Sequence, residues 1–263
     1  MEHLVQHAVT TIRERFREPL SLDELARGAM VSKFYFLRVF TRVTGVTPGR
    51  FLCAVRLQEA KHLLLSTPLT VADIAVRVGY SSTGSFTRRF TELVGLSPTQ
   101  YRKSLREPDE HREPTPAGTA PAPAPAPAAA AAASAPAGRC TGSVTGVLRT
   151  AGTLLSPVYV GAFDSAVLQG TPASWSNASA SGSFTLARVP AGTWYIHAVA
   201  QGRHPGGADG AEATPLTATV GPVRVKGGTA HRVGITLTPP DWSRPPILSA
   251  LMGLDLDPQP MAA

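Results

Sequence analysis

One short pattern occurs twice in the chain, about 50 residues apart, and this duplication constrains the fold more than any other feature. Residues 22–26 (LDELA) match residues 71–75 (VADIA) at an offset of 49, and residues 36–40 (FLRVF) match residues 86–90 (FTRRF) at an offset of 50. The one-residue difference falls between the two blocks, where a turn can absorb it. The first hundred or so residues therefore contain two copies of one small unit.

Each copy is predicted to be a helix, a turn and a second helix. Ser21 with Glu24, and Thr70 with Asp73, have the spacing of a capping box, in which a hydroxyl caps the helix and an acid follows three residues later. This pattern marks the start of the first helix in each copy. The small residues that close packing between two crossing helices requires are Ala26 and Ala75.

Glycine and serine residues predict the turns and the second helices. Gly28 and Gly79 lie near the turns, where a short connection favours glycine. Ser32 in the first copy, and Ser82 or its neighbour Ser81 in the second, are placed to cap the second helices. The apolar positions predicted to be buried on those helices are Phe36, Val39, Phe40 and Val43 in the first copy and Phe86, Phe90 and Leu93 in the second.

A helix from about Pro48 to Leu65 is predicted to join the two copies. Thr47 and Pro48, like Ser97 and Pro98 after the second copy, place a hydroxyl at the N-cap and proline at the first helical position. A helix of this length spans about 27 Å, and successive major-groove faces of B-DNA lie roughly 34 Å apart. With the widths of the units added, such a spacer suits two recognition helices in adjacent major-groove segments.

The segment from about Ser21 to Arg106 resembles the DNA-binding domain of AraC-family regulators. The residues that carry the resemblance most specifically lie in the second copy: Ile74, Ala75, Val78, Gly79, Tyr80, Ser81, Phe86, Arg88, Phe90, Gly95, Ser97, Pro98, Tyr101 and Arg102. The resemblance implies an all-α tandem helix-turn-helix domain over residues 1–106. The chain departs from the family in two ways: the extra domain follows the DNA-binding domain instead of preceding it, and Met30-Val31 before Ser32 is unusually apolar.

In a helix-turn-helix, the first part of the second helix faces the base edges. The predicted base contacts are Lys33, Phe34, Leu37 and Arg38 in the first copy, and Thr83, Ser85, Thr87 and Arg88 in the second. Arg38 and Arg88 are equivalent, lie where the family motif places contacts, and can each donate two hydrogen bonds to guanine; the alternative is a surface charge or a phosphate contact. Phe34 and Leu37 either meet thymine methyls or pack within the domain, and Gly84 offers no side chain.

Phosphate contacts need N–H groups and hydroxyls at helix starts, with arginines beside them. The candidates are Ser32, Thr47, Ser82, Ser97, Thr99 and Gln100, with Arg42, Arg50, Arg89 and Arg102. Their alternative role, capping and solvation of the helices, is compatible with such contacts.

The distribution of charge supports an anionic partner for the N-terminal part. Residues 1–106 carry 16 Lys and Arg against 8 Asp and Glu, whereas residues 107–263 carry 9 against 10. This asymmetry favours nucleic acid first and a membrane surface second. Because the chain shows neither a signal peptide nor an apolar run long enough to span a bilayer, we expect a cytoplasmic protein that binds no membrane. Cys53 and Cys140 fit neither a disulfide framework nor a metal cluster.

The composition changes near Glu107 and again near residue 139. Residues 107–138 are predicted to be a semi-rigid Pro/Ala-rich linker. Residues 139–240 then have the short alternating segments of a small all-β antiparallel sandwich with about seven strands. The segments predicted as strands are Val144–Leu148, Val158–Phe163, Ser183–Leu186, Thr193–Ala200, Pro222–Lys226 and His231–Leu237. Residues 241–263 form a Pro-rich tail, whose apolar residues Ile247, Leu248, Leu251, Met252 and Leu254 have helix-like spacing.

The β region is similar to the carboxypeptidase regulatory-like (prealbumin-type) fold. The matching residues are Gly142–Gly146, Pro157–Val160, Ser181–Phe184 and Val189–Tyr195. His197, His204 and His231 are scattered, with no acid at metal-ligand spacing, so we expect no catalytic residues, no metal and no cofactor.

These features predict a sequence-specific transcription regulator that binds double-stranded DNA at promoter sites, and RNA polymerase is a candidate partner. The alternative is an interaction or scaffold protein with only non-specific affinity for DNA; an enzyme ranks third. The β region is expected to bind a ligand, another protein or a second copy of itself. The apolar tail docks on the β region, on a partner, or on nothing.

Overall fold

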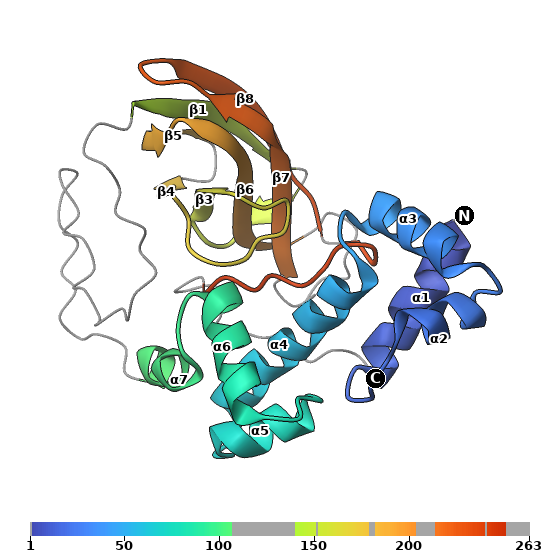
Figure 1. The fold of residues 1–263 in the computed structure, drawn as a ribbon. Helices are drawn as coiled ribbons and strands as arrows, with labels where there is room; N and C mark the ends of the chain where they lie inside the picture. The colour runs from blue at the N-terminus through green and yellow to red at the C-terminus, as the bar shows by residue number, and fades with distance from the viewer. Residues whose placement is uncertain are drawn as a thin grey trace.

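The computed structural model describes residues 2–106, 140–150, 152–178, 182–203, 214–239 and 241–250. They form a helical domain and a β domain (Figure 1). The predicted linker, residues 107–138, and the tail residues Leu251, Met252 and Leu254 lie outside the described residues.

The predicted pair of helix-turn-helix units is confirmed. The helices are α1 (Glu2–Arg15), α2 (Leu22–Gly28), α3 (Lys33–Thr44), α4 (Pro48–Ser66), α5 (Val71–Arg77), α6 (Thr83–Val94) and α7 (Pro98–Arg106). Helices α2 and α3 form the first copy, α5 and α6 the second, and α4 runs between them (Figure 1). Both predicted capping boxes are present, at Ser21–Glu24 and at Thr70–Asp73.

Helix α1 has no counterpart in the repeat and was not predicted. It buries Val5, Ala8, Val9 and Ile12, which recur at intervals of three and four residues along one face. That spacing is a helix signal, and it was available in the sequence. Helix α1 packs on α2, α3 and α4, so it completes the core of the first copy.

The turn of the first copy differs from the prediction. Gly28 is the last residue of α2, and the residue that adopts the left-handed conformation is Met30, with φ of 54°. Its equivalent at an offset of 49 is Gly79, with φ of 87°. The second copy has one more residue before the next helix, so the cap of α6 is Ser82 and not Ser81.

An aromatic row forms the centre of each copy, and the two rows match residue by residue. In the first copy the ring centroids of Phe36 and Phe40 lie 5.6 Å apart, and those of Phe40 and Phe51 lie 5.7 Å apart. In the second copy the equivalent distances, from Phe86 to Phe90 and from Phe90 to Tyr101, are also 5.6 and 5.7 Å. All six rings are fully buried, so one packing solution serves both copies.

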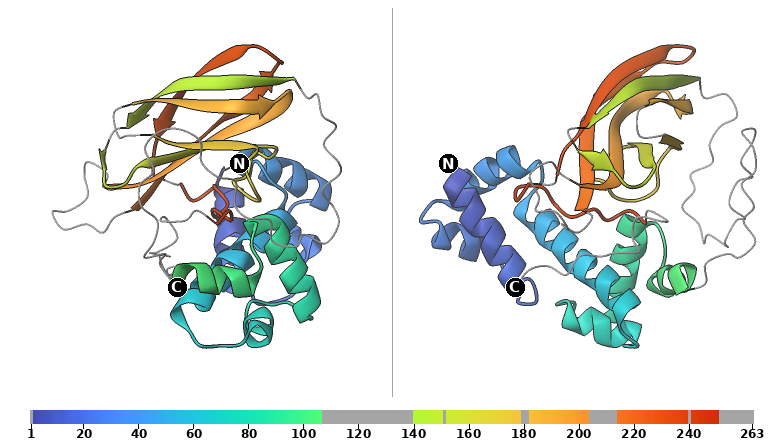
Figure 2. Two further views of the ribbon diagram at one scale, coloured as in Figure 1. Left: turned by 90° about the vertical axis from the view of Figure 1, so that its left-hand side faces the viewer. Right: turned by 180° about the vertical axis from the view of Figure 1, so that it is seen from behind.

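The β domain consists of two sheets that share one core. The strands are β1 (Thr141–Thr150), β2 (Thr153–Leu154), β3 (Val158–Phe163), β4 (Ser174–Ala178), β5 (Ser183–Pro190), β6 (Gly192–Arg203), β7 (Thr214–Val225) and β8 (Ala230–Leu237). One sheet has the order β5-β1-β8, and the other has the order β2-β6-β3-β4 with β7 also paired to β6. Figure 2 shows these sheets on one side of the molecule and the helices on the other.

One prediction for the β region is wrong, and another is incomplete. The sheets are not wholly antiparallel, because β1 and β8 pair in parallel from Ser143 opposite Ala230 to Thr150 opposite Leu237. The strand predicted at Pro222–Lys226 is the end of a longer strand, β7, whose first half holds Leu216 and Ala218 against the core. Pro222 follows Gly221, with φ of 156°, at a shift of register between β6 and β7, which is where the predicted strand began.

The turn residues provide a stability test. In Met30→Gly, glycine removes the strain of the left-handed conformation, and the lost side chain was 92% exposed. We expect the free energy of unfolding to rise by about 0.5–1 kcal/mol. In Gly79→Ala, the new Cβ would lie 2.7 Å from the Arg17 carbonyl oxygen, and we expect a loss of about 2 kcal/mol or more.

Urea unfolding of the full chain, followed by the helical circular-dichroism signal, measures both changes. Equal losses for the two variants would contradict the assignment of Met30 as the strained equivalent of Gly79.

Candidate DNA-binding surface

The second helix of each copy has the same length and the same caps. Helices α3 and α6 both have 12 residues, a serine N-cap in extended conformation and a left-handed glycine at the C-terminal end. The amide of Tyr35 donates to the Ser32 hydroxyl over 3.4 Å, and the amide of Ser85 donates to the Ser82 hydroxyl over 3.2 Å. The two helices are therefore structurally equivalent.

The predicted base contacts of the first copy lie on the open side of α3. Lys33, Phe34 and Arg38 are exposed, and Leu37 is half-buried. The Phe34 ring is 77% exposed, so it does not pack within the domain. Its neighbour Lys33 has its ammonium 5.7 Å from the ring centroid and 3.6 Å from an Asp23 carboxylate oxygen.

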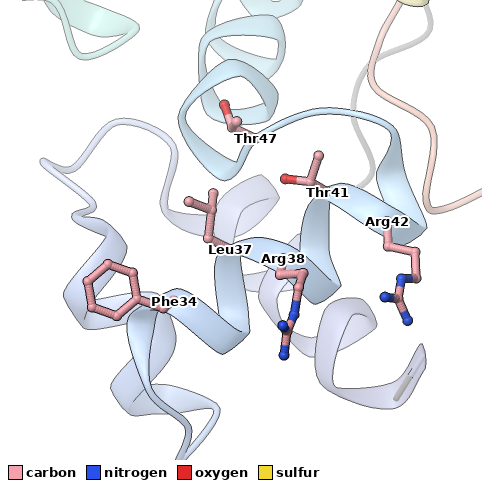
Figure 3. Close-up of a pocket in the computed structure, with 6 residues that line it drawn as sticks. All are labelled: Phe34, Leu37, Arg38, Thr41, Arg42 and Thr47. Atoms are coloured by element: carbon pink, nitrogen blue, oxygen red, sulfur yellow. The ribbon is translucent and has the colours of Figure 1, made fainter.

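These side chains border an open hollow of about 510 Å³ (Figure 3). It is lined by Phe34, Leu37, Arg38, Thr41, Arg42 and Thr47. Arg38 and Arg42, one turn apart, point the same way, whereas Leu37 and Thr41 lie on the side of Thr47 at the start of α4 (Figure 3). The surface thus combines an apolar strip with two guanidinium groups.

Helix α6 presents smaller side chains than α3 at the predicted base contacts. Thr83, Ser85 and Arg88 are exposed, and Thr87 is half-buried. The Ser85 hydroxyl donates to the Ser82 carbonyl over 3.0 Å, so it belongs to the helix cap as well as to the surface. Gly84 is exposed, and nothing lies within 4 Å of the Cβ that another residue would place there. Arg88 is the only long side chain among the predicted base contacts of α6.

The predicted phosphate contacts fall into groups. The hydroxyls of Ser32, Thr47, Ser82 and Ser97 each accept a hydrogen bond from the backbone N–H three residues later. The residues Arg42, Arg50, Arg89, Thr99 and Gln100 are exposed around these helix starts. Two of these exposed side chains already have partners in the protein. Arg89 pairs with Glu92 at 3.1 Å, and the Gln100 amide oxygen accepts from the Ser97 backbone N–H at 3.0 Å.

Arg102 differs from the other arginines because it is half-buried. Its guanidinium donates to the Leu64 carbonyl over 3.0 Å and to the Leu69 carbonyl over 2.6 Å. It therefore ties α7 to the last turns of α4 and to the connection between α4 and α5. This side chain serves the architecture of the second copy in the present structure.

Helix α4 fixes the separation of the two copies. It has 19 residues, which at a rise of about 1.5 Å per residue is roughly 28 Å. Its buried residues include Phe51 at one end and Leu64 at the other. Arg56, near its middle, donates to the carbonyls of Phe16 (2.7 Å) and Glu18 (2.8 Å), and burial lowers the pKa of this guanidinium below its ordinary value. Sequence reasoning did not identify Arg56, because its partners are carbonyls far away along the chain.

The described residues hold neither a metal-ion site nor a helix that could span a membrane. No group of three or more His, Cys, Asp or Glu lies in a position to hold a metal ion there. None of the helices described above is both long and apolar enough to cross a membrane. His197 is buried, with Nε2 at 2.8 Å from the Ser165 carbonyl oxygen and Nδ1 at 3.0 Å from the Thr219 hydroxyl, so it serves the packing of the β domain.

Comparison with known proteins assigns the helical domain. A family model described as a helix-turn-helix domain matches residues 25–104. Over 98 residues the chain is 40% identical to an uncharacterised HTH-type transcriptional regulator of Haemophilus influenzae, a match that covers 37% of this chain and 33% of that one. Over 101 residues it is 33% identical to the HTH-type transcriptional activator AarP of Providencia stuartii, covering 38% of this chain and 75% of that protein.

Among solved structures, the DNA-binding domain of the transcriptional factor AdpA in complex with a target DNA is similar, with 29% identity and a TM-score of 0.38. That match covers 39% of this chain and 92% of the other. Similar regulators match between 32% and 39% of this chain. The chain spans about a third of the length of several of them, including the regulator of Haemophilus influenzae.

Two helix-turn-helix units, together with these sequence matches, define an AraC-type helix-turn-helix DNA-binding domain. The chain belongs to the AraC-type helix-turn-helix family of regulators.

The start of α6 can be tested by opposite changes. Ser82→Ala removes the acceptor of the Ser85 N–H, and we expect it to lower the free energy of unfolding by about 1 kcal/mol. Gly84→Ala places a methyl group in open space, and we expect it to raise that free energy by roughly 0.5 kcal/mol. Thermal or urea unfolding of the full chain would measure both, and a loss of stability in Gly84→Ala would show that the start of α6 is not a regular helix.

Proposed function

We propose that this protein recognises a promoter sequence by placing α3 and α6 in two adjacent segments of the major groove. The observation that carries the proposal is the pair of equally long, equally capped recognition helices on one helix of about 28 Å. A single chain then reads two neighbouring half-sites without needing to dimerise.

The two helices divide the recognition unequally. In the first copy Arg38 donates to guanine, and the exposed ring of Phe34, with Leu37, meets thymine methyl groups. Lys33 contributes a further donor. In the second copy Arg88 provides the long donor to guanine. The shorter residues of the second copy, Thr83, Ser85 and Thr87, read fewer bases.

Contacts to the DNA backbone set the register. Hydroxyls and N–H groups at the helix starts bind phosphate oxygens, where the helix dipole favours negative charge. The proposed set is Ser32, Thr47, Ser82, Ser97, Thr99 and Gln100, with Arg42, Arg50, Arg89 and Arg102. Arg102 has to release one of its carbonyl partners to take part, so we rank it last.

The β domain is proposed to be a prealbumin-type sandwich that binds another protein and is joined to residues 1–106 by the linker at 107–138. Its two sheets enclose a core of aliphatic and aromatic side chains, with residues such as Val144, Leu186 and Ile196 fully buried. The interior is therefore filled, which favours an external surface for binding. RNA polymerase is one such partner for a regulator that activates its promoter.

Selection of bound sequences from random DNA, with the full chain, tests the proposal. A defined site with two half-sites about one helical turn apart is expected. Binding that depends on salt but not on sequence would instead support a scaffold with non-specific affinity.

Substitution of Arg88 tests the assignment of the base contacts. Because a bidentate contact to guanine distinguishes one base, Arg88→Ala should weaken binding to the selected site by about 1–3 kcal/mol and relax preference at one position. Arg15→Ala is the matched control, since Arg15 lies on α1, outside the recognition helices, and pairs with Glu18. Gel-shift titrations on selected and random DNA measure both. Equal loss of affinity on the two DNAs would mean that Arg88 contacts phosphate only.

A further inference from the structure

The second domain contributes side chains to the core of the helical domain. Val167, from the connection between β3 and β4, and Leu248, from the C-terminal segment (residues 241–250), are 8% and 1% exposed and belong to the hydrophobic cluster of the helices. Figure 2 shows the C-terminal segment, in red, passing between the sheets and the helices. Near its start, the Trp242 carbonyl accepts from the Arg13 guanidinium of α1 over 3.3 Å.

Residues 167–170 and 247–250, which we call the clasp, bind to each other and to the end of α6. The Leu248 N–H donates to the Leu168 carbonyl over 3.0 Å, and the Ser249 hydroxyl donates to the Gly170 carbonyl over 2.9 Å. These bonds join two segments that lie 80 residues apart along the chain. The clasp is therefore a single structural unit.

The clasp supplies the hydrogen-bond donors that the end of α6 lacks. The last four carbonyls of a helix have no partner within it. Here the Gly170 N–H donates to the Leu93 carbonyl over 2.5 Å, and the Ala250 N–H donates to the Val94 carbonyl over 3.0 Å. The second domain thus completes the carboxyl end of the second recognition helix.

A buried ammonium group ties the clasp to α4 as well. Lys61 is 2% exposed, and its Nζ donates to the carbonyls of Ile247 (3.5 Å) and Ser249 (3.4 Å). Burial of a charged group is costly unless acceptors surround it. The two carbonyls of the C-terminal segment offset part of the cost of burying Lys61. The segment therefore contacts both α4, through Lys61, and α6, through Val94.

The first recognition helix has no equivalent arrangement. The matching carbonyls of α3 belong to Val43 and Thr44, and no backbone N–H of the β domain reaches them among the described residues. The clasp also leaves the reading surface open, because the proposed base contacts, Thr83 to Arg88, lie in the first half of α6 and the clasp holds its last turn.

We infer that the clasp couples the β domain to the second recognition helix, so that specific binding of DNA is tighter when the β domain is docked. Docking fixes the end of α6 against α4 before DNA binds. Less conformational entropy is then lost on binding. Release of the clasp by a protein bound to the β domain would weaken the second half-site and leave the first intact. This inference rests on the proposed function.

The test compares Leu248→Glu with Pro239→Glu in the full chain. Glutamate at position 248 would place a charge in the helical core, whereas Pro239 is exposed and precedes the clasp. In Leu248→Glu, the Gly170 and Ala250 amides should lose protection from hydrogen exchange. Affinity for the selected site should fall about five- to twentyfold, while the slope of affinity against salt stays the same because no phosphate contact is lost. The control should match the wild type in all three measurements.

Leu248→Ala in the full chain provides a second variant that introduces no buried charge, and a loss of affinity in the same direction is expected. Unchanged or tighter DNA binding in either variant, with the amides unprotected, would overturn the inference and leave the proposed function intact. If the wild-type chain itself selects no site, the proposed function fails first, and the inference fails with it.

Discussion

The structure depends on the burial of α4 between two copies of one motif. Its first turn places Phe51 against the aromatic row of the first copy, and its last turns bury Leu63 and Leu64 beside the second. A helix held at both ends in this way cannot turn about its axis without exposing apolar surface at one of them. The spacing and orientation of α3 and α6 follow from this constraint, and so does the size of the DNA segment that we propose the chain recognises.

The helical domain was predictable because local signals and the duplication agree. Capping boxes, serine N-caps and proline at the start of α4 each mark a boundary, and the second copy confirms the interpretation of the first. The turn of the first copy was predicted wrongly at Met30, where a non-glycine residue adopts the left-handed conformation that glycine adopts at position 79. The β domain was less predictable, because strand pairing is non-local: nothing in residues 143–150 indicates that they lie parallel to residues 230–237.

For the candidate site, the exposure of several side chains was predictable from the sequence, but their hydrogen-bond partners were not. The exposure of Phe34 and Arg38 follows from helical periodicity. The two hydrogen bonds that the Arg102 guanidinium donates to backbone carbonyls depend instead on where α7 packs. The contact between the C-terminal segment and α6 could not be predicted either. Ala250, whose N–H bonds to the Val94 carbonyl, lies 156 residues after it, and the spacing of the apolar residues around Leu248 predicted a helix, whereas residues 245–248 have no regular secondary structure.

We propose that α4, a rigid helix, sets the distance between the two recognition helices, α3 and α6. It is tested most directly by measuring the affinity of the full chain for a series of duplexes in which the two selected half-sites are moved apart one base pair at a time. Affinity should peak at a single separation near one helical turn, about 10–10.5 base pairs, and fall sharply when about five more are added, because the second half-site then faces the opposite side of the duplex. Equal affinity across the series would contradict the claim.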